Sequence, residues 1–198
     1  TYVTNLISSA AAFATEEFCS AAERPLVYLY YTRNLGPVYA KHTEGSDRLT
    51  SASDANWGVR RSTSGWVIMY GGAVILSVTR KQHCIAMSTC ESELMALAGL
   101  ALDLVWVRSI LEHLGVEFTE EPEAETDDPE AAHRIERVMH GPVEVDTDSK
   151  SAYDLCHRHT AGDSSRHVKR REWKMREFQF KQVVRLRLVT TDKMTADI

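Results

Sequence analysis

Residues 49–78 alternate between β-rich apolar runs and short polar connections. Residues 49–55 form a short strand candidate, and the runs 66–70 and 73–78 lie on either side of a Gly-Gly pair at 71–72. A two-residue glycine connection between β-rich runs is typical of a hairpin with a primed turn. The polar residues 60–65 are interpreted as a loop. The pattern therefore predicts three antiparallel strands.

A helical periodicity follows over residues 89–114. Ser88 with Glu91 three residues later forms a capping-box pattern, which marks a helix start. Gly115 stands where helices commonly end. Glu93 falls in the first turn, just before the apolar face begins. That face, with three- and four-residue spacing, consists of Leu94, Leu97, Ala98, Ala101 and Val105.

The second half alternates strand-like and helix-like segments. Residues 142–146 predict a strand, a short helix follows from Ser149, and a basic helix spans 166–182. A last strand covers 184–189, and a final helix would begin near Thr191 or Asp192. Hairpin strands followed by strand–helix alternation predict an α/β fold with a mixed five-stranded sheet flanked by helices. The basic helix would bury Trp173, Met175 and Phe178.

The N-terminal residues predict a helical extension. Thr15 before Glu16 and Glu17 is a plausible helix start with acids in the first turn. Pro25 should end or kink this helix. We therefore divide the chain into a linking segment, 1–45, and one domain, 46–198.

Composition narrows the class of protein. A chain of 198 residues with 43% hydrophobic and 26% charged residues is ordinary for a globular domain. No apolar run is long enough to span a bilayer and the N-terminus does not resemble a signal peptide, so we expect no membrane partner. The lack of an initiator Met indicates a piece of a longer protein. Four cysteines without metal-site spacing indicate reduced thiols in an intracellular, reducing compartment.

Charge is distributed unevenly. Residues 117–130 carry eight acidic and no basic residues, so the rest of the chain has a net charge of +3 rather than −5. We interpret residues 117–135 as an acidic, mobile insert. Residues 166–187 carry nine Lys and Arg against two Glu. This basic segment suits a polyanionic partner, although a solvated helix face gives the same pattern.

The candidate chemistry lies in four acidic residues. Asp148 follows the predicted strand 142–146, at the carboxyl end where open α/β sheets place their chemistry. Asp54, Glu93 and Asp197 have settings that could bring them to the same point. Carboxylate oxygens are the ligands that Mg²⁺ prefers, and two such cations assist phosphodiester hydrolysis. The four acids therefore predict a divalent-metal site for cutting nucleic acid.

Seven motifs occur in an order that resembles a known family. They are SDANW, RRSTSGW, the GGA hairpin, STCESELMAL, VWVRSILEHLG, TDSKSA and TADI. In order and spacing they are similar to the ribonuclease H domain of copia-type (Pseudoviridae-like) LTR retrotransposon polyproteins. The match covers residues 15–115 and 141–198, and LVYLYYTRNLG resembles the segment that links the reverse transcriptase to this domain. The resemblance implies a ribonuclease H-like fold with three antiparallel strands and then parallel additions.

The resemblance also implies an activity. The family's catalytic, metal-binding acids fall on Asp54, Glu93, Asp148 and Asp197, with Glu91 kept as the helix cap. The implied enzyme is an endoribonuclease that hydrolyses the RNA strand of RNA–DNA hybrids during reverse transcription, with two Mg²⁺ ions for which Mn²⁺ can substitute. Its implied partners are the hybrid and the reverse transcriptase domain of the same polyprotein, in cytoplasmic retrotransposon particles.

Substrate contacts are expected from the polar loop, a helix N-terminus and the basic helix. Contacts of this kind to the nucleic-acid backbone carry little base information, so we expect little sequence specificity. The acids Glu136, Glu144 and Asp146 are interpreted as solvated. The expected nucleic-acid-binding residues are Arg60, Arg61, Ser62, Ser64, Ser88, Thr89, His167, Lys169, Arg170 and Lys174.

Two other functions stay open at this point. One is a hybrid-binding connection domain with weak or no activity, and the other is a different nuclease or strand-transferase of the same fold. The presence of all four acids argues against the first. The RRSTSGW and SELMAL motifs argue against the second. A preference for hybrid over duplex DNA would discriminate among them.

Overall fold

The computed structural model describes residues 2–13, 15–39, 48–58, 60–119, 138–140, 142–157 and 166–196. Its helices are α1 (Tyr2–Ala10), α2 (Glu16–Tyr31), α3 (Thr89–His113), α5 (Lys150–His157) and α6 (Arg166–Phe180), with 3-10 turns at Ala11–Phe13 and Thr191–Lys193. Its strands are β1 (Thr50–Asn56), β2 (Thr63–Tyr70), β3 (Ala73–Lys81), β4 (Glu117–Thr119), β5 (Val138–His140), β6 (Val143–Thr147) and β7 (Val184–Leu188).

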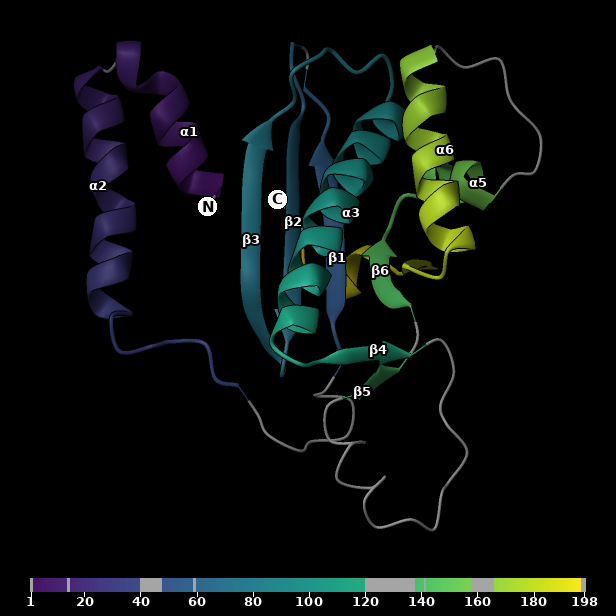
Figure 1. Ribbon diagram of the computed structural model, residues 1–198. Coiled ribbons are helices and arrows are strands. Elements are labelled where there is room, and N and C mark those ends of the chain that lie inside the picture. Colours follow the sequence, from purple (N-terminus) through teal and green to yellow (C-terminus); the bar gives the residue numbers. More distant parts are fainter. Residues whose placement is uncertain are drawn as a thin grey trace.

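Five strands form the predicted mixed sheet, in the order β3-β2-β1-β6-β7 (Figure 1). β1, β2 and β3 pair antiparallel, whereas β6 and β7 add in parallel to β1. The hairpin between β2 and β3 turns at Gly71 and Gly72, whose φ angles of 61° and 76° are those of a primed turn. The fold class expected from the sequence is therefore confirmed.

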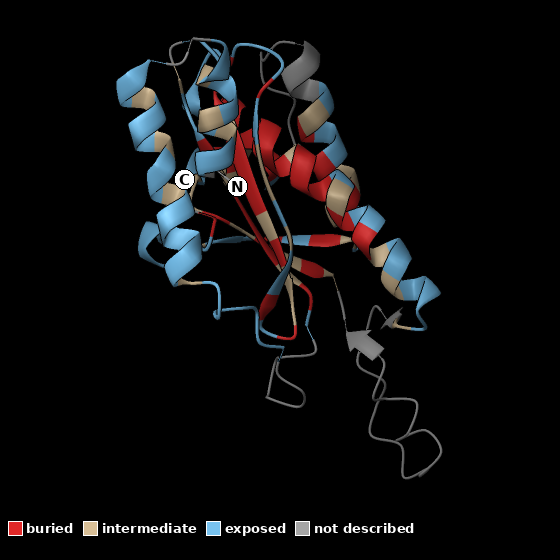
Figure 2. Ribbon diagram, turned by 90° about the vertical axis from the view of Figure 1, so that its left-hand side faces the viewer, coloured by how far each residue is buried: buried red, intermediate tan, exposed pale blue. Residues whose placement is uncertain are grey.

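α3 lies across one face of this sheet and contributes more residues to the hydrophobic core than any other element (Figures 1 and 2). Its C-terminus has the bonds of a Schellman motif, in which Gly115 at φ 84° donates to the Glu112 carbonyl and Val116 donates to that of Leu111. Of the described helices, α3 alone is long and apolar enough to cross a membrane, and half of its most apolar stretch is buried in the fold.

The buried face of α3 differs in one position from the predicted one. Val105 is 40% exposed, whereas Leu104, one residue earlier, and Val107, two residues later, are buried. Apolar residues occur around most of the circumference of this helix. Their spacing alone therefore does not determine, to within one residue, which of them face the sheet. The buried residues that contact the sheet and the neighbouring helices include Leu94, Leu97, Leu100, Ala101, Leu104 and Val107.

α6 packs beside α3, and of its described basic side chains Arg170 and Lys174 are exposed whereas Arg171 and Arg176 are half-buried. Met175 and Phe178 are buried as predicted, but the expectation for Trp173 is wrong because that side chain is 57% exposed. Glu172 takes an inward position instead and forms an ion pair with Arg176 one turn later. A buried carboxylate is tolerated here because it is paired.

The N-terminal helices form a hairpin beside the edge strand β3 (Figure 1). Asn5 Nδ2 donates to the Thr79 carbonyl of β3 at 3.3 Å. α2 is capped by Thr15 as predicted, and it continues through Pro25, so the helix does not end at this proline, which was one of the two expected outcomes. Proline removes one helical hydrogen bond, and on this helix without buried residues water can satisfy the carbonyl left over.

Two further predictions need correction. β2 already begins at Thr63, so the end of the expected loop 60–65 belongs to the sheet, where it pairs with β1. The expected mobile insert is wrong at Glu117–Thr119, because this segment is strand β4 and pairs in parallel with β5. The rest of the insert, 120–135, lies outside the described residues.

Gly99 of α3 lies close to the Trp66 ring of β2. A Cβ placed there would lie 2.7 Å from the Trp66 ring, and that buried ring is fixed by a 2.8 Å hydrogen bond from its Nε1 to Asp103. Gly99→Ala is therefore expected to lower the free energy of unfolding by about 1–3 kcal/mol despite alanine's better helix propensity. Urea unfolding would measure it. Gly36→Ala, which meets nothing within 4 Å, should have little effect, and a stabilised Gly99→Ala protein would contradict the prediction.

Candidate active site

Parallel pairing brings two of the predicted acids to one edge of the sheet. Ala52 of β1 lies opposite Asp146 of β6. Asp54 and Asp148 each stand two residues beyond that pair, so the two strands present them at the same level. Asp148 follows the last residue of β6 and precedes α5, and it accepts a 3.0 Å hydrogen bond from Thr191 Oγ1.

The first turn of α3 supplies the third acid. Ser88 caps the helix by accepting a hydrogen bond from the Glu91 N–H, and the Glu91 carboxylate accepts one from the Met87 N–H. This cap leaves Glu93 to face the sheet, where it is only 8% exposed. Carboxylate oxygens of Glu93, Asp54 and Asp148 all lie within 4.8 Å of one another. The structure thus brings together three of the four acids that the sequence singled out.

Burial and crowding change the titration of this cluster. The pKa of Glu93 is raised to about 8, first by its desolvation and then by the negative charges of Asp54 and Asp148, while a hydrogen bond from the Ala55 backbone lowers it. One Glu93 oxygen, Oε2, is buried without a hydrogen-bond partner. An unpaired buried carboxylate oxygen beside two other carboxylates is an unfavourable arrangement unless a cation or a proton compensates it.

A buried glutamine connects α3, which carries Glu93, to β2, the strand that pairs with the Asp54-bearing β1. The Gln82 side chain donates to Ser64 Oγ of β2 at 2.8 Å and to the Ser92 carbonyl of α3 at 2.9 Å. Ser64 lies opposite Ala55, the neighbour of Asp54, and Ser92 precedes Glu93. Sequence reasoning missed Gln82, because a single glutamine after a strand shows no pattern that reveals two distant partners.

Gln82→Leu is expected to destabilise the protein by about 1–3 kcal/mol, because it removes two buried hydrogen bonds. It should also weaken Mn²⁺ binding by about 10–100-fold, the usual cost of losing a residue that orients metal ligands. Chemical unfolding and calorimetric titration with Mn²⁺ would measure the two effects. Gln179→Leu is the matched control, since Gln179 also donates to a carbonyl, that of Cys156, away from the carboxylates. Equal Mn²⁺ affinity in both variants would refute the positioning role.

The remaining predicted site residues have different positions. Asp197 lies outside the described residues, and so do the side chains of His167 and Lys169. Ser62 and Ser64 are buried within the fold, where Ser62 Oγ accepts from the Gly58 N–H and Ser64 contacts Gln82. The other predicted nucleic-acid-binding side chains reach the surface: Arg60, Arg61, Ser88, Thr89, Arg170 and Lys174.

Comparisons with known proteins agree with this geometry. No protein-family model matches the chain. It is 31% identical over 125 residues to the retrovirus-related Pol polyprotein from transposon RE1 of Arabidopsis thaliana, a match that covers 61% of this chain and 8% of the polyprotein. The corresponding polyprotein from transposon TNT 1-94 of Nicotiana tabacum is 24% identical over 139 residues, covering 70% of this chain and 9% of the polyprotein. The chain therefore spans less than a tenth of these relatives.

A different kind of relative is the secreted RxLR effector protein 161 of Plasmopara viticola, which is 34% identical over 91 residues, covering 44% of this chain and 63% of the effector. Among solved structures, a ribonuclease H1 isolated from compost by a metagenomic approach superimposes with a TM-score of 0.50 at 14% identity, over 74% of this chain and 87% of that enzyme. At this identity the likeness concerns the fold.

Proposed function

This chain belongs to the ribonuclease H-fold domains of copia-type Pol polyproteins, and from that premise we propose that it hydrolyses the RNA strand of RNA–DNA hybrids. One observation carries the proposal. Three carboxylates from β1, α3 and the end of β6, far apart in the sequence, have oxygens within 4.8 Å of one another. Since like charges repel at this separation, such a cluster favours cation binding.

The residues fit a hard divalent cation. All three are oxygen donors, the class that Mg²⁺ prefers, and Glu93 Oε2 is buried without another partner. Asp54, Glu93 and Asp148 would hold the metal. Bound Mg²⁺ ions would supply activation of water and charge stabilisation at a phosphodiester. We propose two ions, as the resemblance implies, with Mn²⁺ able to replace them.

The side chains around the cluster have supporting roles in this proposal. Thr191 Oγ1 donates to Asp148 and so orients its carboxylate. Asp197 is proposed as the fourth acid. Its neighbour Ala196 is buried and packs in one cluster with Ala52, two residues before Asp54. The hybrid is the proposed substrate, and the reverse transcriptase domain of the same polyprotein is the proposed covalent neighbour, within particles in the cytoplasm.

Cleavage of labelled nucleic acids tests the proposed function. The chain is incubated with an RNA–DNA hybrid, double-stranded RNA and double-stranded DNA, in Mg²⁺, in Mn²⁺ and in EDTA. We expect metal-dependent cleavage of the RNA strand of the hybrid alone. Binding of hybrid without cleavage in either metal would refute the enzyme and favour a connection domain. Preferential cleavage of duplex DNA would favour another nuclease of this fold.

A further inference from the structure

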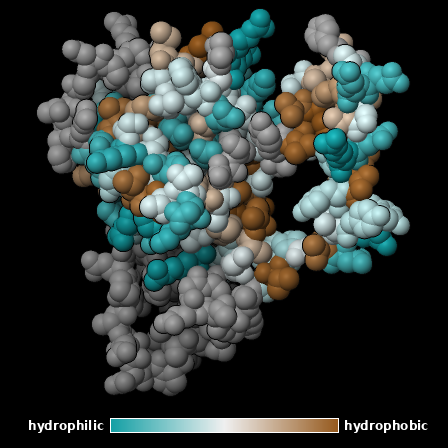
Figure 3. Space-filling view, turned by 180° about the vertical axis from the view of Figure 1, so that it is seen from behind, coloured by the Kyte–Doolittle hydropathy of each residue, from teal (hydrophilic) through white to brown (hydrophobic). Residues whose placement is uncertain are grey.

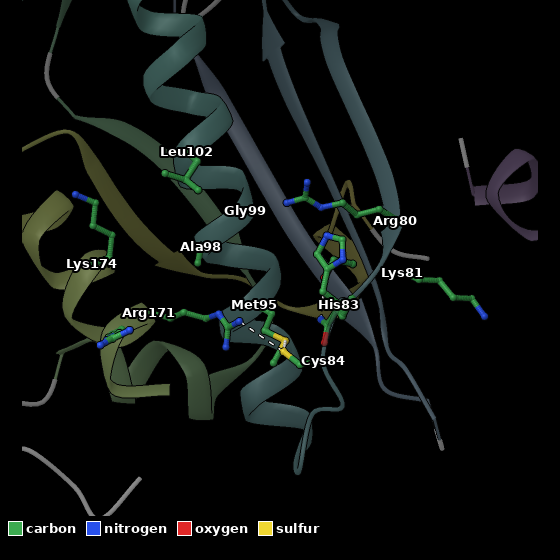
Figure 4. Close-up of a pocket in the computed structure, with 13 residues that line it drawn as sticks. Arg80, Lys81, His83, Cys84, Met95, Ala98, Gly99, Leu102, Arg171 and Lys174 are labelled. Atoms are coloured by element: carbon green, nitrogen blue, oxygen red, sulfur yellow. Dashed lines mark hydrogen bonds between the residues drawn. The ribbon is translucent and has the colours of Figure 1, made fainter. Parts of the chain in front are cut away.

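A cleft of about 310 Å³ lies on the outer side of α3, between the end of β3 and the first turns of α6 (Figure 4). Its floor includes Met95, Ala98 and Gly99 of α3. Small residues on the helix leave this space open between two longer side chains. Figure 4 shows Arg80 extending from β3 toward the helix and Arg171 extending from α6 across it.

The lining of the cleft is strongly basic. It includes five Lys and Arg and one His, and no Asp or Glu among the described residues. Lys174 is offset by Glu177, its partner at 3.0 Å. The other cationic lining residues are Arg80, Lys81, Arg170 and Arg171, and His83 lies among them. A concave surface with one sign of charge concentrates ions of the opposite sign.

Arg80 and Arg171, on the two sides of the cleft, have only weak interaction partners. Arg80 lies over the Trp66 ring, with its guanidinium carbon 4.6 Å from the ring centroid. Arg171 Nη2 donates to the Cys84 sulfur at 3.7 Å, whereas its Nη1 is buried and has no hydrogen-bond partner. A buried guanidinium nitrogen without an acceptor is costly, and an anion in the cleft would satisfy it.

We propose that this cleft binds backbone phosphates of the nucleic acid, as an anchoring site separate from the carboxylate cluster; this rests on the proposed function for the identity of the nucleic acid. The position of the cleft supports the proposal. Ser64 and Gln82 line it, and their hydrogen bonds connect β2, the neighbour of the Asp54-bearing strand β1, to α3, which carries Glu93. A phosphate bound beside them fixes the substrate relative to the carboxylates. Arginine suits this task because its planar fork pairs with two phosphate oxygens.

The cysteines of the chain supply a footprinting experiment without any substitution. Cys84 is exposed and touches Arg171, whereas Cys19 is exposed on α2, outside the cleft. Cys156 is buried, and burial together with the nearby Glu172 raises the pKa of its thiol to about 12, so it should stay unreactive. In EDTA, saturating RNA–DNA hybrid should slow the alkylation of Cys84 by iodoacetamide several-fold while leaving Cys19 unchanged, as read by peptide mass spectrometry.

Three results of this footprint would overturn the proposal. They are an unprotected Cys84 in the presence of bound hybrid, equal protection of Cys84 and Cys19, and protection of Cys84 by inorganic phosphate but not by bound hybrid.

Substitutions test the charge directly. Arg171→Gln should weaken hybrid binding and reduce the slope of log affinity against log salt by about 0.9 for each phosphate that is no longer neutralised. Arg170→Gln, at an exposed position, should act in the same direction and guards against misfolding of the first variant. Arg185→Gln is the matched control, because Arg185 is exposed on β7 and does not line the cleft. Fluorescence anisotropy in EDTA measures all three.

The two proposals fail in different ways. Unchanged binding and salt slope in Arg171→Gln and Arg170→Gln, with cleavage intact in the parent, would overturn the anchoring site and leave the hydrolysis standing. Binding that depends on these arginines, in a parent that cleaves nothing, would support the anchoring site and overturn the hydrolysis.

Discussion

Asp148→Asn is expected to reduce metal-dependent hybrid cleavage by about 10²- to 10³-fold or more, the scale of removing one preorganised electrostatic interaction at a reacting centre. The substitution keeps the shape of the side chain and its ability to accept from Thr191. It removes one negative charge from a cluster whose oxygens lie within 4.8 Å of one another. Single-turnover cleavage of a labelled hybrid in Mg²⁺ would measure the loss.

Asp146→Asn is the matched control for this variant. Asp146 lies two residues earlier and has the same chemistry, but its carboxylate accepts two hydrogen bonds from Arg187, at 2.7 and 2.9 Å, and is not part of the cluster. Cleavage by Asp146→Asn should stay close to that of the parent. Equal losses in the two variants would show that Asp148 acts only through the stability of the fold.

The stability of the metal-free protein is expected to fall as pH rises from about 4.5 to about 8. The pKa of Glu93 moves from 4.5 to about 8 on folding, chiefly through burial. Between these values the folded state binds a proton that the unfolded state does not, so each added pH unit costs the fold about 1.4 kcal/mol. Below the lower value the penalty is absent, and above the upper value it is complete. Thermal unfolding in EDTA across this range would measure it.

Glu93→Gln removes the group responsible and gives the sharper test. The variant should be more stable than the parent at pH 8 in EDTA, by a few kcal/mol, and its stability should change less with pH. Mg²⁺ should stabilise the parent and have less effect on the variant, because a ligand that binds only the folded state shifts unfolding by mass action. Glu112→Gln, on the exposed end of the same helix, should keep the parent's pH dependence. A pH profile that is the same in both variants would exclude Glu93 as its source.

Local patterns account for most of what could be predicted about the fold. The paired glycines and Gly115 predicted backbone conformations that the structure contains, because positive φ angles favour glycine. Ser88 also predicted a helix start from local sequence, because its hydroxyl accepts a hydrogen bond from the N–H of Glu91, only three residues later. Val105 and Trp173 were assigned to the wrong side of their helices. Which of two adjacent residues faces inward depends on packing and ion pairing between elements, and the spacing of apolar residues does not record these.

The candidate site shows the same division. Asp54 and Asp148 could be located because each stands at the end of a strand, and the resemblance singled out Glu93. Gln82 could not be found, since its two contacts join segments that the sequence keeps apart. Asp146 looked solvated for the same reason, although β6 and β7 pair it with Arg187. Contacts across a parallel sheet depend on register, and register appears only with the folded chain.

The absence of buried side chains on α2 affects how the protein unfolds locally. Sixteen residues of helix with no buried side chain gain little from tertiary packing, and Figure 3 shows apolar atoms still uncovered on this part of the surface. A helix of that length is marginal in water on its own. Its amide hydrogens should therefore exchange with solvent nearly as fast as those of a free peptide, whereas those in the middle of α3 should exchange only when the whole sheet unfolds. The sheet and the helices that cover it would then unfold in one cooperative transition. The N-terminal helical hairpin would unfold separately, at a lower free energy.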